Sequence, residues 1–408
     1  MKKKIIKVFP KIKLMKGLEI RTASVGIKST TREDVTLIIF RELANVATVL
    51  TKSKTCAANI TWLKKIRNSG KAKVLFVNSG NANAYTGKKG YQNVIHIVKT
   101  LSKIYECDVK NILISSTGVI GEQLPIEKII QALHTLALKN NKLNQNWLSF
   151  AKAITTTDTF PKGVCKKTSI KNKSYNIIGV SKGSGMIAPN MATMLAFIFT
   201  DANLSSKALN RLLKSTVQKS FNSITVDGDT STNDMVSLFS VNSKKNNSKY
   251  FLDNEILDTF KKDLEEVAIE LAKKIVLDGE GAKKLIEVEV SGAKTNNQAK
   301  DVALKISNSL LVKTAIAGED ANWGRIIMAI GKSSSSVNPN KISLNIGKSA
   351  VIVNGEICKD YSEEKVSEYL KNTQINIAID LSLGKGHHKV WTCDLTKKYI
   401  EINADYRS

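Results

Sequence analysis

The sequence predicts an α/β protein with mixed sheets and flanking helices. Short apolar runs typical of buried strands alternate along the chain with longer segments whose apolar residues recur at helical spacing. With 408 residues, of which 42% are hydrophobic, the chain is long enough for two domains or one large two-layer body, each with its own core. Because each element must bury an apolar face, we expect the strands to form sheets covered by the helices.

The first half of the chain contains four strand patterns and two helix patterns. The strands are runs of apolar and β-branched residues at 35–40, 46–51, 73–77 and 111–114. The helices, near 91–104 and over 126–138, have apolar side chains that recur every three or four residues. Each of the two compact strands at 73–77 and 111–114 runs into a glycine-rich polar loop, a common place for a functional site.

The second half continues the alternation. Helices are predicted over 204–221 and 254–275, and strands over 285–290 and 375–381. Residues 399–402 alternate in a strand-like way, which predicts that a last strand ties the carboxyl terminus into the body of the protein.

The net charge of +26 is distributed unevenly. Residues 1–192 contain 33 Lys and Arg against 9 Asp and Glu, an excess of 24, whereas residues 193–408 contain 29 against 27, an excess of 2. The basic residues form no arginine stripe and are not interleaved with aromatic residues that could stack on bases, so we expect no nucleic-acid partner. The excess of basic residues is also compatible with a positive electrostatic field that attracts an acidic substrate.

The composition also limits the cellular compartment and the kinds of metal site that the sequence predicts. No run of about 18 apolar residues is present, and the basic start lacks the apolar core of a signal peptide, so we expect a cytoplasmic protein without a membrane partner. The five cysteines form no close pair, which disfavours a zinc site and a disulfide framework. An EF-hand loop counted from Asp227 would need Glu at its twelfth position, which is Leu238, so that calcium site is excluded.

The segment from Lys182 to Thr200 presents a candidate nucleophile. Two glycines and a proline precede an apolar run, so a restricted loop delivers Thr193 to the start of a predicted buried strand. From position alone, a hydroxyl at a strand start is more often structural than catalytic. The residues by themselves therefore leave both readings open.

Three other loops leave similar alternatives. Glycine in the turn at Thr117-Gly118 lets neighbouring N–H groups face one point, as an oxyanion hole requires, although a plain turn has the same composition. Residues 155–162 crowd hydroxyls around Asp158, which fits a cap and turn or a substrate-binding loop. Glu280 lies between two glycines and, on composition alone, is a solvated turn residue.

These segments together resemble the ornithine acetyltransferases, the acetyl-recycling enzymes of arginine synthesis. The shared motifs occur in the same order along nearly the whole chain and begin at Asn78 (NSGNANA), Thr117 (TG), Thr156 (TTDTFPK), Asp227 (DGDTSTND) and Cys393 (CDLT). The resemblance implies a self-processing two-fragment acetyltransferase that breaks the Ala192-Thr193 bond. It thus implies an alpha fragment of residues 1–192 and a beta fragment of residues 193–408 that begins with the nucleophile Thr193.

The resemblance also implies the other site residues and the partners. Thr117 and Gly118 correspond to the family's oxyanion hole, and the substrate-contacting positions fall on Thr156, Lys182, Thr193, Glu280, Asn403 and Ser408. The implied substrates are N²-acetylornithine and glutamate, with no metal or organic cofactor, in a heterotetramer of two alpha and two beta fragments. The family contains enzymes with and without acetyl-CoA as a second donor, and no motif in this chain decides between them.

The implied chemistry is consistent with the residues present. The chain has only four histidines, but cleavage before a threonine creates an α-amine with a pKa of about 7.7–8.0 that can act as the base. An amino-terminal-nucleophile amidase or aminopeptidase would use the same threonine and pass the acyl group to water. A basic nucleic-acid binder would explain the charge but none of the ordered motifs, and an assay for acetyl transfer to glutamate separates all three hypotheses.

Overall fold

The computed structural model describes residues 7–27, 31–138, 145–170, 173–188, 194–241, 254–334 and 336–405. The chain divides into two compact units. Unit 1 consists of Met1–Gly183, Asn190–Phe221 and Thr230–Leu271, and unit 2 of Ser184–Pro189, Asn222–Asp229 and Ala272–Ser408. Each unit contains residues from both sides of the Ala192-Thr193 bond, so the compact units differ from the two predicted fragments.

Unit 1 is built on an eight-stranded mixed sheet. The described strands are β1 (Leu18–Ala23), β2 (Val35–Leu50), β3 (Lys71–Asn78), β4 (Ile112–Ser116), β5 (Lys162–Ile170), β6 (Lys173–Lys182), β7 (Leu195–Thr200) and β8 (Met235–Ser240). Their order is β4-β3-β2-β8-β7-β6-β5, and β1 pairs with β2 outside this path. The pairs β3–β4 and β7–β8 are parallel and the others are antiparallel, which confirms the predicted mixed α/β class.

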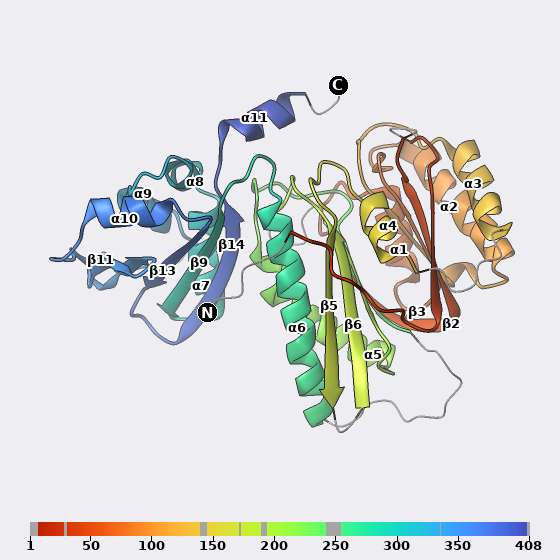
Figure 1. Ribbon diagram of the computed structural model, residues 1–408, viewed down its shortest axis with the longest axis horizontal. Helices are drawn as coiled ribbons and strands as arrows, with labels where there is room; N and C mark the ends of the chain where they lie inside the picture. Colours follow the sequence, from red (N-terminus) through yellow and green to blue (C-terminus); the bar gives the residue numbers. More distant parts are fainter. Residues whose placement is uncertain are drawn as a thin grey trace. The chain divides into compact units, whose positions relative to one another are not determined.

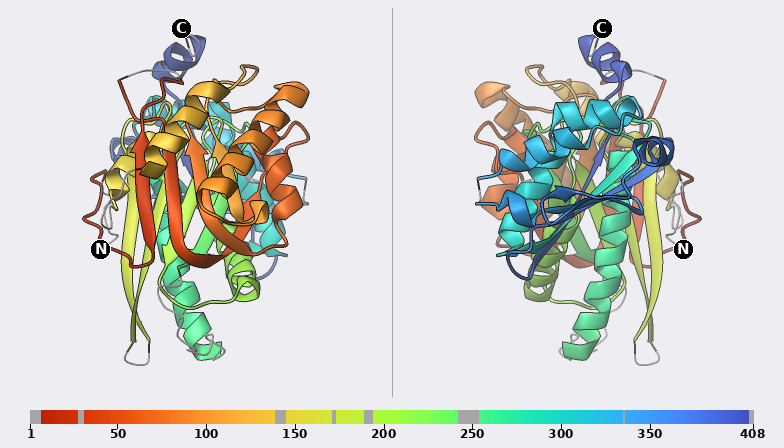
Figure 2. Two further views of the ribbon diagram at one scale, coloured as in Figure 1. Left: turned by 90° about the vertical axis from the view of Figure 1, so that its right-hand side faces the viewer. Right: turned by 90° about the vertical axis from the view of Figure 1, so that its left-hand side faces the viewer.

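Helices cover both faces of this sheet. Figures 1 and 2 show α1 (Ala58–Ile66), α2 (Gly87–Ile104), α3 (Ile126–Leu138) and α4 (Trp147–Ala153) on one face, and α5 (Ser206–Lys219) and α6 (Asn254–Leu277) on the other. The four helices predicted from periodicity in this part of the chain are α2, α3, α5 and α6, and all four are confirmed. The short 3-10 helices are η1 (Val109–Asn111) and η2 (Phe221–Ser223). Among the helices of the described ranges, none is long and apolar enough to cross a membrane.

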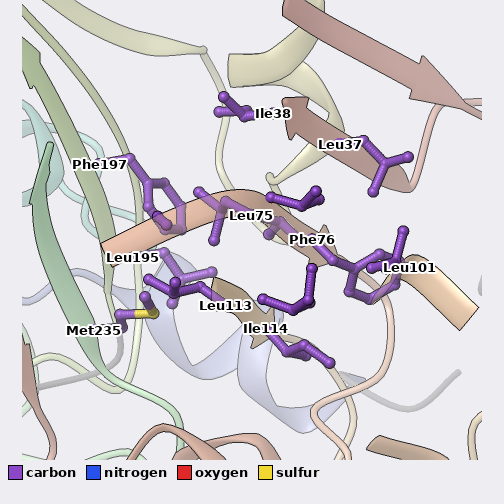
Figure 3. Packing of buried hydrophobic residues seen from close by; sticks show 14 of the residues in the cluster. Leu37, Ile38, Leu75, Phe76, Leu101, Leu113, Ile114, Leu195, Phe197 and Met235 are labelled. Atoms are coloured by element: carbon purple, nitrogen blue, oxygen red, sulfur yellow. The ribbon is translucent and has the colours of Figure 1, made fainter. Parts of the chain in front are cut away.

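The core of unit 1 is formed by the inward faces of these strands and helices. Figure 3 shows Leu75 and Phe76 of β3 packed among Leu113 and Ile114 of β4 and Leu101 of α2. On the neighbouring strands, the ring of Phe239 stacks against the rings of Phe40 and Phe199, with centroids 5.1 and 5.0 Å apart. Each fully buried side chain of this size stabilises the fold by about 1.5–3 kcal/mol. This packing holds the strand ends, and the loops that follow them, in place.

Unit 2 is built on a six-stranded mixed sheet in the order β12-β11-β10-β13-β9-β14. Its strands are β9 (Leu285–Ala293), β10 (Ser343–Ile346), β11 (Ser349–Val353), β12 (Glu356–Ile357), β13 (Gln374–Asp380) and β14 (Gly386–Cys393). Its helices are α7 (Asn296–Ser307), α8 (Leu310–Ala317), α9 (Trp323–Gly331), α10 (Glu363–Leu370) and α11 (Lys397–Ala404), with η3 at Pro339–Lys341. Helix α7 packs on β9 and β14, and the strands β9 and β13 confirm the two strand predictions made here.

The two strands predicted at 35–40 and 46–51 are one strand, β2, of 16 residues. Its pairing with β3 shifts between Ile39 and Ala44, and the residues at 41–43 are exposed. The residues between the two predicted runs are therefore the irregular part of a continuous strand.

The predicted strand over 399–402 is wrong, because this segment forms helix α11, labelled near the carboxyl terminus in Figure 1. The side chain of Thr396 accepts a hydrogen bond from the Lys398 N–H and so caps the first turn of the helix. The side chain of Ile400 is 70% exposed, as an apolar residue on the outer face of a terminal helix can be. Four residues are too short a window to separate a period of 2 from a period of 3.6.

Candidate active site

The turn at Thr117-Gly118 follows β4 and lies against the loop that follows the parallel strand β3. The Thr117 N–H donates to the Asn78 carbonyl at 3.0 Å. Gly118 has a φ of +132°, and a Cβ at this position would lie 2.2 Å from the carbonyl carbon of Gly80. Only glycine fits both the dihedral angle and the close approach of the two loops, so the backbone of this turn is held rigidly.

Lys182 brings three of the predicted site residues together. It is the last residue of β6 and only 3% exposed. Its Nζ donates to the Thr117 hydroxyl oxygen at 3.1 Å and to the Thr156 hydroxyl oxygen at 2.8 Å. Because an ammonium group can only donate, each hydroxyl accepts from Lys182 and keeps its own proton for a further acceptor. The Lys182 cation therefore orients both hydroxyl groups so that each can donate a hydrogen bond to another acceptor.

A buried carboxylate supports this group. Asp158 accepts hydrogen bonds from Lys162 Nζ at 2.6 Å, from the Gly183 N–H at 2.7 Å and from the Thr156 N–H at 3.1 Å. The side chains of Asp158 and Lys162 are fully buried. Burial by itself would raise the pKa of Asp158, but Lys162, Lys182 and the Gly183 N–H hold it well below its usual range. Asp158 is therefore an ionised group at neutral pH.

The acidic run that ends at β8 also reaches this part of unit 1. The side-chain amide of Asn233 donates to the carbonyl of Ser116, which precedes Thr117, at 2.9 Å. Asp234 accepts from the N–H of Met194 at 3.1 Å, and burial raises the pKa of Asp234 well above its usual range. The backbone directly after the predicted nucleophile is thus attached to β8. Ala192 and Thr193 themselves lie outside the described residues.

Two further predicted residues meet within unit 2. The Asn403 side-chain amide, on α11, donates to Glu280 Oε2 at 2.9 Å, and the Glu280 N–H donates to the Ser184 carbonyl at 2.9 Å. A Cβ on Gly185 would lie 2.3 Å from Glu280 Oε2, so this carboxylate can occupy its position only above a glycine. Ser408, the last predicted contact, lies outside the described residues.

Asp227 fixes the backbone beside Glu280 in the same unit. Its carboxylate accepts from the N–H groups of Met186 and Ile187 at 2.6 and 2.8 Å. Burial raises the pKa of Asp227, and the Tyr399 hydroxyl donates to its Oδ2 at 3.4 Å. Burial and the Asp227 carboxylate raise the pKa of Tyr399, so this hydroxyl stays protonated.

The sequence drew attention to the motifs that contain Asp158, Asn233 and Asp234 but assigned no role to these residues. Each of these side chains forms a hydrogen bond with a backbone group of a segment that is distant in the chain. The signal available was a carboxylate among hydroxyls with a lysine four residues later, and this pattern does not identify the distant hydrogen-bond partner, the N–H of Gly183.

Comparisons with known proteins identify the family. The ArgJ family model matches residues 19–408. The arginine biosynthesis bifunctional protein ArgJ of Bartonella quintana is 45% identical over 396 residues, covering 97% of this chain and 96% of the relative, and that of Agrobacterium fabrum is 43% identical over 405 residues, covering 98% of each. The solved ArgJ structure from Bacillus halodurans is 45% identical, with a TM-score of 0.49, and covers 51% of this chain and 97% of that chain. The chain therefore belongs to the ArgJ family.

Proposed function

We propose that this protein transfers an acetyl group from N²-acetylornithine to glutamate, releasing ornithine and N-acetylglutamate. The proposal includes cleavage of the Ala192-Thr193 bond by the chain itself and an acetyl ester on the Thr193 hydroxyl as the intermediate. Membership of the ArgJ family over residues 19–408 supports the reaction class.

The observation that carries the proposal is the contact of Lys182 with two hydroxyls, Thr117 and Thr156. A tetrahedral intermediate places negative charge on the former carbonyl oxygen of the acetyl group, and donors fixed in advance stabilise that charge. Because Lys182 occupies a lone pair of the Thr117 oxygen, the Thr117 hydroxyl can donate its proton to this oxyanion. The Gly118 N–H, in the same turn, is the second proposed donor.

The nucleophile needs a base, and the proposed base is the α-amine that cleavage creates. Its pKa of about 7.7–8.0 in an unperturbed chain suits proton transfer near neutral pH. The amine takes the Thr193 hydroxyl proton as the bond between Oγ and the acetyl carbon forms. It returns the proton to the ornithine nitrogen as the amide C–N bond breaks. The neutral amine of glutamate then attacks the ester carbonyl carbon. The new C–N bond forms as the bond between that carbon and Thr193 Oγ breaks, and the α-amine of Thr193 passes the proton lost by the glutamate nitrogen to Oγ.

The amino-acid substrates carry both charges, and the proposed binding residues complement them. Lys182 and the Thr156 hydroxyl supply donors for a carboxylate. Glu280 supplies an acceptor for an ammonium group, and Asn403 keeps the Glu280 carboxylate in one orientation. We assign Ser408 to the same substrate on the strength of the family motif alone.

The proposal extends to the assembly and the second donor. We infer a heterotetramer of two 1–192 and two 193–408 fragments. We infer a cytoplasmic location, since all five cysteines are unpaired thiols, as is usual in a reducing compartment. The relatives are named bifunctional, and we propose that acetyl-CoA can also acetylate Thr193.

Steady-state kinetics with purified protein test the reaction. Acetylornithine and glutamate should give parallel double-reciprocal lines, and a quenched sample should contain an acetylated peptide that begins at Thr193. Replacing acetylornithine by acetyl-CoA tests the second donor. Release of acetate at the same rate with and without glutamate would support the amidase hypothesis instead, and intersecting lines without an acetylated peptide would exclude the intermediate.

A further inference from the structure

We propose that Asp158 is a positioning residue for the acetyl transfer, because it holds Thr156 and Lys182 in place relative to each other. This inference rests on the proposed function, in which both residues bind the substrate. Asp158 lies in the motif at residues 156–162, for which the sequence left a structural turn and a substrate-binding loop as alternatives.

The three hydrogen bonds of Asp158 explain how one carboxylate can do this. One goes to the backbone N–H of Thr156, whose hydroxyl accepts from Lys182. Another goes to the N–H of Gly183, the residue that follows Lys182. Asp158 is therefore attached to the backbone of both members of the Lys182–Thr156 contact. A shift of either segment would lengthen that contact, at a site where small displacements have large effects on rate.

The third hydrogen bond, to Lys162, suggests a purely structural alternative. Asp158 and Lys162 form a fully buried ion pair, and burying a charge requires a partner. A buried ion pair of this kind can often be replaced by uncharged residues without loss of stability, provided that both partners change together. If Asp158 served only Lys162, replacing both should therefore restore activity as well as stability.

The test compares Asp158→Asn, Lys162→Met and the double variant in thermal unfolding and in acetyl transfer. Asp158→Asn should lose both stability and activity, because Lys162 loses the carboxylate and Asn offers a single acceptor oxygen. The double variant should recover the melting temperature but keep a kcat/KM at least about tenfold below wild type, since the two N–H groups are still not held together. Lys162→Met alone should lose stability, because the buried Asp158 carboxylate loses its cation, but it should retain transfer per folded molecule, since Asp158 keeps its hydrogen bonds to the N–H groups of Thr156 and Gly183.

A double-mutant cycle with Lys182→Met supplies a readout that a structural role does not change. If Asp158 acts through Lys182, Asp158→Asn should reduce kcat/KM much less in the Lys182→Met background than in the wild-type background. Recovery of both stability and activity in the double variant with Lys162, or full multiplication of the two effects in the cycle, would overturn the inference.

Two controls separate this inference from the proposed function. A wild-type protein without acetyl transfer to glutamate would refute the function and the inference together, whereas an active wild type with an active double variant would refute the inference alone. Should neither Asn variant fold, the activity of Lys162→Met per folded molecule decides: its retention supports positioning by Asp158, and its loss supports the structural alternative.

Discussion

Replacing Thr117 by Val tests the proposed oxyanion hole most directly. Valine keeps the shape of the side chain, which is buried, and removes only the hydroxyl that accepts from Lys182 at 3.1 Å. Loss of one oxyanion donor typically raises the barrier by about 2.7–4 kcal/mol, so we expect kcat to fall by roughly 10²–10³. KM should change little, because the negative charge on the acetyl oxygen develops only in the transition state.

The same change should lower stability, because the Lys182 ammonium loses the Thr117 oxygen as an acceptor in a buried site. An unsatisfied buried donor costs about 1–3 kcal/mol, which thermal unfolding can detect. Thr117→Ser is the matched control, since it keeps the hydroxyl and should retain most of kcat. Thr156→Val removes the other hydroxyl and should act mainly on KM. A Thr117→Val protein with kcat within about threefold of wild type would refute the assignment of Thr117.

The other predictions concern processing, the carboxyl terminus and pH. Intact mass spectrometry should find fragments of 192 and 216 residues in wild type and a whole chain of 408 residues in Thr193→Ala; a fully active uncleaved wild type would contradict self-cleavage. Deleting Asn403–Ser408 removes the donor to Glu280, so the deletion should abolish acetyl transfer yet leave cleavage intact. Turnover near the wild-type rate would show that these residues do not bind substrate. Burial and, to a smaller extent, nearby positive charge lower the pKa of His388 to about 4. The neutral His388 ring should therefore make its full contribution to the free energy of unfolding above pH 6.5, and this contribution should decline as the pH falls toward 4. For this half-buried ring we expect about 1–2 kcal/mol relative to His388→Gln, and equal pH dependence of the two proteins would contradict it.

Local periodicity in the sequence was sufficient for the fold class, for the four longest helices that the structure describes and for several of the strands. The helix predicted over 126–138 has the bounds of α3, because thirteen residues with a clear apolar stripe contain several turns. The apolar runs at 73–77 and 111–114 became the parallel strands β3 and β4. Prediction failed over 399–402, where a short segment fits both periods, and over β2, where exposed polar residues interrupt the pattern without ending the strand.

The motifs in the sequence also indicated which residues matter, but only the tertiary structure decided which of them touch. Thr117 lies 65 residues from Lys182, and Thr156 lies 26 residues from it, yet both hydroxyls accept from the same ammonium group. These contacts depend on the order and register of strands, which are set by packing between distant segments and leave no local pattern in the chain. For the same reason, the sequence identified Asp158 only as a carboxylate in a polar motif. The structure showed that this carboxylate accepts hydrogen bonds from the backbone N–H groups of Thr156 and Gly183.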